Sequence, residues 1–262
     1  MQNHFSYRFS QNIWRILPDS DGGNNLWVIE LRDATEKKVS FAVIDIAKEE
    51  LVWEGAPDGT DWWSSLTAFS NQLIYLHNYR FPEIPEPTDL IAFSGRSGDM
   101  LWELPNHVLV SVLDNETIEI AQKQGDRFIK KFVNAATGEL LPAFEKPAAD
   151  TNEILLVEPV RYRKGNDYFE KLQAFIKERT NGHIASGIDY LERRPYVIFS
   201  YYIYEQDKTV QYLLIVTDQN QLVLHEKLSD ERDGMGRSTM ILKASTLVYL
   251  KNNNEFSSLT LS

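Results

Sequence analysis

The sequence predicts an all-β fold, and two observations carry that prediction. Short runs rich in Ile, Val, Tyr and Phe recur along the whole chain, and these residue types pack well on a pleated surface. Polar connectors containing Pro, Gly or Asn separate the runs, and they prevent a strand or a helix from continuing through them. We therefore expect a succession of short antiparallel strands.

One two-strand unit recurs along the chain. It appears as FAVIDIAKEELVW (Phe41–Trp53) and as LIAFSGRSGDMLW (Leu90–Trp102): an apolar strand, a polar turn and a shorter strand that closes on Trp. Related segments are KKFVNAATGELLP (Lys130–Pro142), LQAFIKERTNGHIAS (Leu172–Ser186) and LLIVTDQNQLVLH (Leu213–His225). Their closing positions are 49, 40, 44 and 39 residues apart. A loose period of about 43 residues is typical of the blades of a β-propeller.

Further strand-like runs precede these units and complete a four-stranded repeat. One run lies directly before each unit, at Asn25–Leu31, Asn71–Tyr79, Glu116–Gln122, Glu153–Tyr162 and Tyr196–Tyr204. A second set lies earlier still, at Ile13–Leu17, Trp62–Phe69, His107–Leu113 and Ser238–Ser245. Each repeat is thus predicted to be a four-stranded antiparallel sheet with strands A to D in chain order. The A strands of the fourth and fifth repeats are not evident.

The two ends of the chain predict how the repeats close. The C-terminal segment after Ser238–Ser245 supplies strands B and C but no D, while His4–Ser10 has no repeat of its own. We expect this N-terminal segment to be the missing D strand, which would close a ring and remove an open sheet edge. The 262 residues then make six blades of about 44 residues each. The prediction is a single six-bladed β-propeller domain covering residues 1–262.

The segment Leu172–Ser186 also allows a helical interpretation. Leu172, Phe175 and Ile176 lie at the spacing of one helix face. The segment has no convincing N-cap, and it aligns with siblings that are clearly strand-like, so strands are the favoured interpretation.

Composition narrows the classes of function. A net charge of −11 disfavours binding to nucleic acid or to an anionic membrane. The absence of cysteine excludes disulfides, thiolate catalysis and Cys-type zinc sites. No apolar run approaches the ~18–20 residues that span a bilayer, and the N-terminal segment lacks the apolar core of a secretory signal. We therefore expect a cytoplasmic protein with neither a nucleic-acid nor a membrane partner.

The turns in VNAATGELL and SGRSGDMLWEL resemble the repeat of PQQ-like (quinoprotein-type) β-propellers, in which a Thr-Gly or Ser-Gly turn leads to a strand ending in Trp. The resemblance implies that Trp53 and Trp102 pack between neighbouring blades. Quinone dehydrogenases of that family need adjacent cysteines and a calcium-bound quinone, so we expect no cofactor and no metal site here. The whole chain is also similar to an uncharacterised bacterial family described only as a domain of unknown function.

Candidate binding residues lie in the D–A and B–C connections, which in a propeller share the face around the channel mouth. They are Asp61, Trp62, Trp63, Tyr79, Arg80, His107, Arg161 and Arg163. Adjacent Trp62 and Trp63 at a strand start would place one ring on each side of the pleat. One ring would then be available to stack a planar or sugar ligand, unless both pack between blades. The arginines would hold a carboxylate or phosphate through paired hydrogen bonds, or else remain solvated loop charges.

The sequence contains no recognisable catalytic constellation, and its five histidines show no spacing typical of a metal site. We therefore expect a non-catalytic binding or interaction module for an unknown protein or small-molecule ligand at the channel mouth. The alternative is a hydrolase or lyase acting on a small carbohydrate or carboxylate. It would use His107 or Asp61 as acid or base and the arginines as an anion clamp. Several ionisable groups gathered around one cavity would favour the enzyme.

Overall fold

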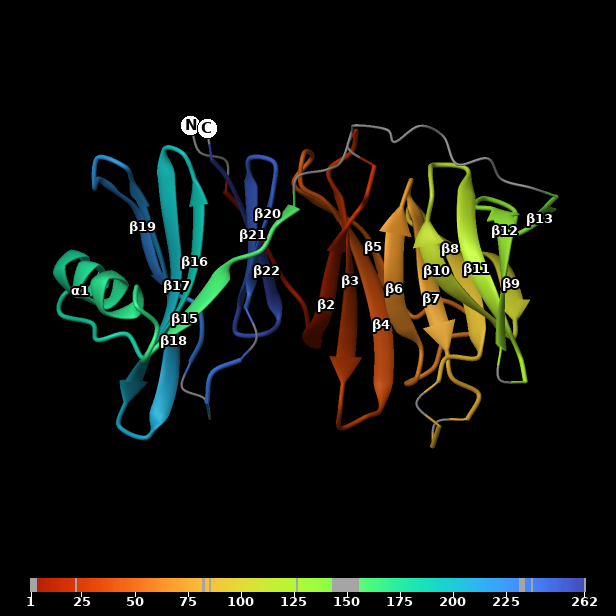
Figure 1. Ribbon diagram of the computed structural model, residues 1–262, viewed down its shortest axis with the longest axis horizontal. Helices are drawn as coiled ribbons and strands as arrows, with labels where there is room; N and C mark the ends of the chain where they lie inside the picture. Colours follow the sequence, from red (N-terminus) through yellow and green to blue (C-terminus); the bar gives the residue numbers. More distant parts are fainter. Residues whose placement is uncertain are drawn as a thin grey trace. The chain divides into compact units, whose positions relative to one another are not determined.

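The computed structural model describes residues 4–21, 23–81, 83–84, 86–125, 127–142, 156–230, 234–236 and 238–261. These residues form 22 strands and one helix. The described strands assemble into five antiparallel sheets, so the predicted all-β class is confirmed (Figure 1). Contacts divide the chain into two compact units, called here the N-terminal unit (Gln11–Ile154) and the C-terminal unit (Met1–Ser10 with Leu155–Ser262).

The N-terminal unit contains three four-stranded sheets whose strands follow chain order, as predicted. The first sheet consists of β2 (Asn12–Pro18), β3 (Leu26–Asp33), β4 (Lys38–Asp45) and β5 (Glu50–Gly55). The second consists of β6 (Ser65–Ser70), β7 (Leu73–Asn78), β8 (Asp89–Ser94) and β9 (Met100–Pro105). The third consists of β10 (His107–Val112), β11 (Thr117–Gln124), β12 (Arg127–Asn134) and β13 (Leu140–Leu141).

The three sheets repeat the same backbone irregularities. The first strand of each carries one residue that interrupts the pairing register, at Trp14, Thr67 and Val110. In the first two sheets the fourth strand does the same, at Val52 and Leu101. Bulges at equivalent places bend equivalent strands in the same way. The repeat in the sequence is therefore also a repeat in backbone geometry.

Trp53 and Trp102 connect each sheet of this unit to the next. The indole Nε1–H of Trp53 donates to the carbonyl of Gly95 at 2.9 Å, in the β8–β9 turn of the second sheet. The indole of Trp102 donates to the carbonyl of Ala135 at 3.0 Å, in the β12–β13 turn of the third sheet. Both indoles thus lie between neighbouring sheets, where the resemblance to propeller repeats placed them.

The C-terminal unit contains two five-stranded sheets. One consists of β15 (Val160–Arg163), β16 (Gly187–Arg193), β17 (Tyr196–Glu205), β18 (Lys208–Thr217) and β19 (Leu222–Lys227). The other has the order β1 (His4–Arg8), β22 (Glu255–Thr260), β21 (Thr246–Lys251), β20 (Met240–Lys243) and β14 (Leu156–Val157). Strand β1 pairs with β22 along its whole length (Figure 1). The prediction that the N-terminal segment completes the C-terminal sheet is therefore confirmed.

The strands predicted within Leu172–Ser186 are wrong, because this segment contains most of the helix α1 (Phe169–Arg179). The helix buries Phe169 and Ile176 against the β15–β19 sheet. The first strands of that sheet are supplied instead by β15 and β16. As a result the described residues form five sheets, where six blades were predicted.

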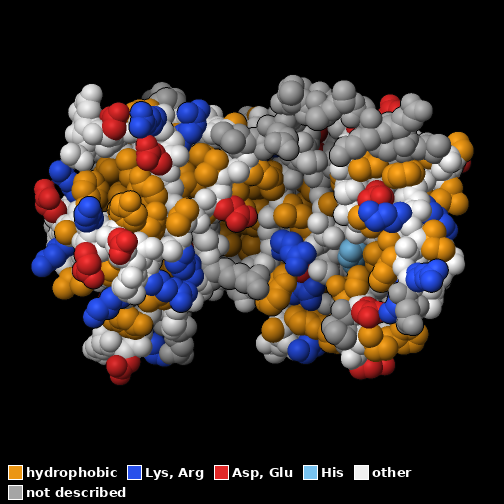
Figure 2. All heavy atoms as spheres, viewed as in Figure 1, with side chains coloured by type: hydrophobic (Ala, Val, Ile, Leu, Met, Phe, Trp, Pro, Cys, Tyr) orange, Lys and Arg blue, Asp and Glu red, His pale blue; other side chains and the backbone are white. Residues whose placement is uncertain are grey.

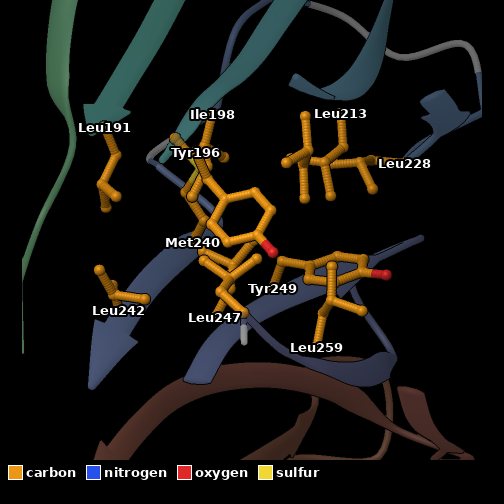
Figure 3. Packing of buried hydrophobic residues seen from close by; sticks show 12 residues of the cluster. Leu191, Tyr196, Ile198, Leu213, Leu228, Met240, Leu242, Leu247, Tyr249 and Leu259 are labelled. Atoms are coloured by element: carbon orange, nitrogen blue, oxygen red, sulfur yellow. The ribbon is translucent and has the colours of Figure 1, made fainter. Parts of the chain in front are cut away.

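The core of the C-terminal unit lies between its two sheets. Leu191, Ile198 and Leu213 from the β15–β19 sheet face Met240 and Leu247 from the other sheet, and all five side chains are buried (Figure 3). At about 1.5–3 kcal/mol for each buried side chain, this cluster is a major part of the free energy that holds the two sheets together.

The single described helix has 11 residues. Among the residues that the structure describes, no helix is both long enough and apolar enough to cross a membrane.

Candidate functional site

A depression of about 270 Å³ in the N-terminal unit gathers three of the predicted site residues. Asp61 comes from the β5–β6 connection, and Tyr79 and Arg80 come from the β7–β8 connection. The other lining residues are Asn78, Asp89, Glu103 and Pro105. Segments from three parts of the chain therefore meet at this edge of the β6–β9 sheet, as expected for connections that share one face.

Arg80 is held in the depression by a buried carboxylate. Its Nε donates to Asp89 Oδ2 at 2.8 Å and its Nη2 to Asp89 Oδ1 at 2.7 Å, while Nη2 also donates to Asn106 Oδ1 at 2.8 Å. The Asp89 side chain is only 5% exposed. Burial alone would raise the pKa of Asp89, but hydrogen bonds from Arg80, Thr88 and the Asn106 backbone hold that pKa below its ordinary value. Asp89 is therefore a carboxylate at neutral pH, and it neutralises Arg80.

The acidic groups of the depression outnumber its one arginine. Asp61 accepts the backbone N–H of Trp63 at 2.8 Å. Neither Asp61 nor Glu103 forms an ion pair with any residue in the described part of the chain. With Arg80 already paired, the depression presents net negative charge. This arrangement favours hydroxyl or ammonium groups of a ligand over a carboxylate.

The two adjacent tryptophans have different surroundings. Strand β6 begins at Ser65, so Trp62 and Trp63 precede the strand, and the expectation that their rings lie on opposite sides of its pleat is wrong. Trp63 is 44% exposed. Trp62 is half-buried. The guanidinium carbon of Arg32 and the Nζ of Lys37 each lie 4.9 Å from the centroid of its ring. Trp63 is therefore the ring available to a ligand, while Trp62 is engaged in two cation–π contacts.

Arg32 fixes the segment that carries the tryptophans. Its Nη1 donates to the Trp62 carbonyl at 2.6 Å and its Nη2 to the Ser64 carbonyl at 2.8 Å. Its Nε donates at 2.6 Å to Glu30 Oε1, and the other Glu30 oxygen accepts the backbone N–H of Leu66 at 2.9 Å. Glu30 is fully buried. One ion pair on β3 thus positions the start of β6 and the segment before it.

Replacing Arg32 with lysine is expected to lower the free energy of unfolding by about 2 kcal/mol. Lysine keeps the positive charge but lacks the planar fork that serves a carboxylate and two carbonyls at once. Urea unfolding measures the change. Arg96→Lys, at an exposed position whose side chain bonds Gln72, is the matched control and should stay within about 0.5 kcal/mol of the wild type. Equal effects of the two substitutions would contradict the positioning role of Arg32.

His107 is not among the residues that line the depression. Its Nδ1 lies 2.9 Å from the carbonyl of Pro105, which requires the proton to be on Nδ1. Its Nε2 is buried and has no hydrogen-bond partner within the described residues. Neither ring nitrogen of His107 is therefore hydrogen-bonded to an ionisable side chain in the described residues.

Arg161 and Arg163 belong to the C-terminal unit. Arg161 makes a two-bond ion pair with Asp189, from Nε at 2.6 Å and from Nη2 at 2.7 Å, and it also donates to the carbonyl of Gly236 at 2.6 Å. The Asp189 side chain is 1% exposed. Arg161 is thus neutralised in the same way as Arg80. Arg163 is exposed, and no described residue forms an ion pair with it.

A larger cavity of about 550 Å³ lies over the β10–β12 strands. Its lining includes Phe81 and Ile84 from the β7–β8 connection and Val108 and Phe128 from the sheet. Phe81, Ile84 and Phe128 are exposed, and Figure 2 shows hydrophobic side chains beside Lys and Arg side chains over the N-terminal unit. None of the predicted site residues lines this cavity. We therefore take the smaller depression as the candidate site.

Sequence reasoning missed Asp89 and Glu103. Asp89 is the first residue of β8 and Glu103 lies within β9, so neither belongs to the connections from which the candidate residues were drawn. A polar residue at the start of an otherwise apolar strand was the available signal for Asp89. The sequence carried no comparable signal for Glu103.

Comparison with known proteins adds a family match and similarities of fold. Residues 20–102, about a third of the chain, match the family described as Domain of unknown function (DUF4905). A solved member of the DUF4221 family from Bacteroides vulgatus is similar, with 10% identity over 98% of this chain and 96% of that chain, and a TM-score of 0.37. No protein with a curated description matches.

Two further solved structures are similar to this chain. The β-propeller domain of the Trilobed protease from Pyrococcus furiosus has 13% identity, and the similarity covers 94% of this chain and 65% of that one, with a TM-score of 0.34. A prolyl endopeptidase has 8% identity, with 92% of this chain and 38% of that one covered, and a TM-score of 0.34. Similarity at this level concerns the fold alone and carries no argument about the site.

Proposed function

We propose that this chain is a non-catalytic binding module, and that its ligand is a neutral or amine-bearing carbohydrate held in the depression of the N-terminal unit. The observation that carries the proposal is the convergence of Asp61, Tyr79, Arg80 and Glu103, from separate segments, on one depression of about 270 Å³. That volume lies near the lower end of small-molecule sites and suits a single sugar ring.

The chemistry of the lining residues supports this ligand class. Glu103 interacts electrostatically with Arg80, but neither Asp61 nor Glu103 forms an ion pair or a side-chain hydrogen bond with a cation in the described residues. Their oxygens are therefore available to accept hydrogen bonds from hydroxyl or ammonium groups. Tyr79 lines the same depression, and an aromatic ring offers an apolar face together with a hydroxyl. Trp63 is exposed and lies two residues after Asp61 in the chain, although it does not line the depression itself. An anionic ligand would meet uncompensated negative charge.

Three sugars that differ mainly in charge test the proposal: glucose, glucosamine and glucuronic acid, each titrated calorimetrically as a monomer and as a short oligomer. We expect glucosamine and glucose to bind more tightly than glucuronic acid. Glu103→Gln should weaken glucosamine binding about tenfold, which corresponds to about 1.4 kcal/mol. Glu54→Gln is the matched control, because Glu54 is an exposed carboxylate on β5 of the same unit and should leave binding unchanged. Preference for glucuronic acid, or no binding of any sugar, would refute the assignment.

We also propose that the described sheets are blades of one β-propeller, with a single ring formed by the whole chain. The pairing of β1 with β22 supports this, since it joins the two ends of the chain in one sheet. The indoles of Trp53 and Trp102, each bonded to the next sheet, support a PQQ-like repeat. Small-angle scattering tests the ring: a compact chain of this length has a radius of gyration of about 18 Å, and a clearly larger value would contradict it.

A cytoplasmic location, supported by the cysteine-free composition, is tested by cell fractionation.

The alternative function, a hydrolase or lyase, is favoured by one observation, the presence of Asp61, Asp89 and Glu103 around one depression. Against it, Asp89 is committed to Arg80, so neither group is free to act as an acid, a base or an anion clamp. Product formation during prolonged incubation with the oligomers, detected by chromatography and lost in Asp61→Asn, would establish the enzyme instead.

A further inference from the structure

Two histidines that are far apart in the sequence meet at one tyrosine in the C-terminal unit. The hydroxyl of Tyr201 lies 2.7 Å from His183 Nδ1 and 2.8 Å from His225 Nε2. Tyr201 is on β17, His225 is on β19, and His183 follows α1. Tyr201 is fully buried, while both histidines are half-buried. The depression assigned to carbohydrate lies in the other unit and shares no residue with this cluster.

The fold holds these three rings in place. Tyr201 pairs with Tyr212 across β17 and β18, and the two rings stack with their centroids 5.7 Å apart. The Tyr212 ring also contacts His183, at 4.7 Å, and His225, at 5.7 Å. Because Tyr212 packs against all three rings, their orientations are fixed by the sheet and by the segment that follows α1.

The number of protons shared by the three side chains shows how a metal ion could replace them. A phenol has one proton, and two imidazole nitrogens lie within hydrogen-bond distance of its oxygen. The hydroxyl donates to one nitrogen, and the N–H of the other imidazole donates to the hydroxyl oxygen. When a metal ion displaces the phenol proton, and the donating imidazole carries its proton on its other ring nitrogen instead, two imidazole nitrogens and one phenolate oxygen remain, and all three are metal ligands.

The separations between these atoms also suit a metal ion. Bonds from a first-row metal to imidazole nitrogen are ~2.0–2.1 Å, and two such bonds at a right angle place the ligand atoms about 2.9 Å apart. The observed separations of 2.7 Å and 2.8 Å are close to that value. The tyrosine oxygen therefore lies about as far from each imidazole nitrogen as two ligands of one metal ion lie from each other.

We propose that His183, Tyr201 and His225 bind a first-row transition-metal ion through two imidazoles and a tyrosinate. The described residues contain no group of three His, Cys, Asp or Glu side chains arranged to hold a metal. In the proposed site the third ligand is instead a phenol. Imidazole ligands suit Cu, Fe, Ni and Zn, and Cu²⁺ binds most tightly among the divalent ions.

The experiment titrates the full-length protein with Cu²⁺ alone and records its visible absorption. We expect one equivalent to bind with a tyrosinate-to-copper charge-transfer band. Tyr201→Phe should abolish the band, and His225→Gln should weaken Cu²⁺ binding at least tenfold. Circular dichroism of each variant shows whether it is folded. If Tyr201→Phe does not fold, the band in the wild type and its loss in His225→Gln decide the question.

A second His–Tyr contact in the same unit supplies the matched control. His4 Nε2 lies 3.0 Å from the hydroxyl of Tyr249, without a second imidazole on that hydroxyl. His4→Gln and Tyr249→Phe should leave the charge-transfer band and the Cu²⁺ affinity unchanged. His4→Gln also tests whether copper bound near the N-terminus contributes to the signal. The proposal is overturned if Cu²⁺ produces no charge-transfer band, or if the band persists in Tyr201→Phe.

Discussion

Replacing Trp102 with alanine is expected to lower the free energy of unfolding of the N-terminal unit by about 3–5 kcal/mol, the range for a large buried aromatic side chain. Trp102 is 9% exposed and packs with Tyr75, Ile118 and Val133 in a core shared by the second and third sheets. Its Nε1–H also bonds the Ala135 carbonyl. The substitution therefore opens a cavity and leaves a buried carbonyl without its donor. Chemical unfolding followed by Tyr and Trp fluorescence measures the change.

Two companion variants separate packing from a general effect of losing tryptophan. Trp63→Ala removes an indole that is 44% exposed and should change the free energy of unfolding by no more than about 0.5 kcal/mol. Gly138→Ala should destabilise the same interface from the other side. Gly138 has φ +71°, and a Cβ there would lie 2.9 Å from Cδ2 of Trp102. If Trp102→Ala costs no more than Trp63→Ala, the indole does not join the sheets.

The same contact explains why the repeat could be predicted from sequence. The contact needs a tryptophan in one sheet and, in the next sheet, a glycine whose missing side chain leaves room for the indole. These two residues must therefore stand at fixed places in successive units, and the pattern is recognisable even where most other residues differ. Gly98 stands in the same relation to Trp53 as Gly138 does to Trp102. All three sheets of the N-terminal unit follow the predicted strand order, although β6 starts at Ser65 rather than at Trp62.

The prediction failed at α1 because alignment with the other repeats was given more weight than the spacing of Leu172, Phe175 and Ile176. The Phe175 ring packs 5.4 Å from the ring of Phe199 on β17, so the apolar side of the segment covers a sheet instead of joining one. A helix with no side-chain cap at its N-terminus gives a weak sequence signal, and its stability comes from that packing.

The candidate site could be predicted only in part. The connections that meet at the depression follow from the strand order, so Asp61, Tyr79 and Arg80 could be named in advance. The pairing of Arg80 with Asp89 depends on how the β7–β8 connection folds back on itself, and spacing in the sequence does not define it. The meeting of His183 with His225 was out of reach for a similar reason, since it requires the helix that the alignment had replaced with strands.

Acidification from pH 7 to pH 5 is expected to lower the free energy of unfolding by about 2 kcal/mol through His77 alone. His77 is on β7, and its Nε2 accepts the backbone N–H of Leu109 on β10 at 3.0 Å. Burial, and to a smaller extent the charge of Arg15, lower the pKa of His77 from 6.5 to about 4. The unfolded chain therefore binds a proton below about pH 6.5 that the folded chain accepts only near pH 4. Stability is lost across that window at up to about 1.4 kcal/mol per pH unit, reaching at most about 3 kcal/mol.

His77→Gln isolates this contribution, because glutamine retains an acceptor for the Leu109 N–H and does not titrate. Urea unfolding at pH 7, 6 and 5 should show a weaker pH dependence in His77→Gln than in the wild type, with most of the difference arising between pH 6.5 and 5. Asp89 and Glu255 have lowered pKa values, so their stabilising charges are lost below about pH 4, outside this range. Parallel curves for the wild type and His77→Gln would mean that His77 is protonated without cost and that the Leu109 hydrogen bond does not hold the imidazole neutral.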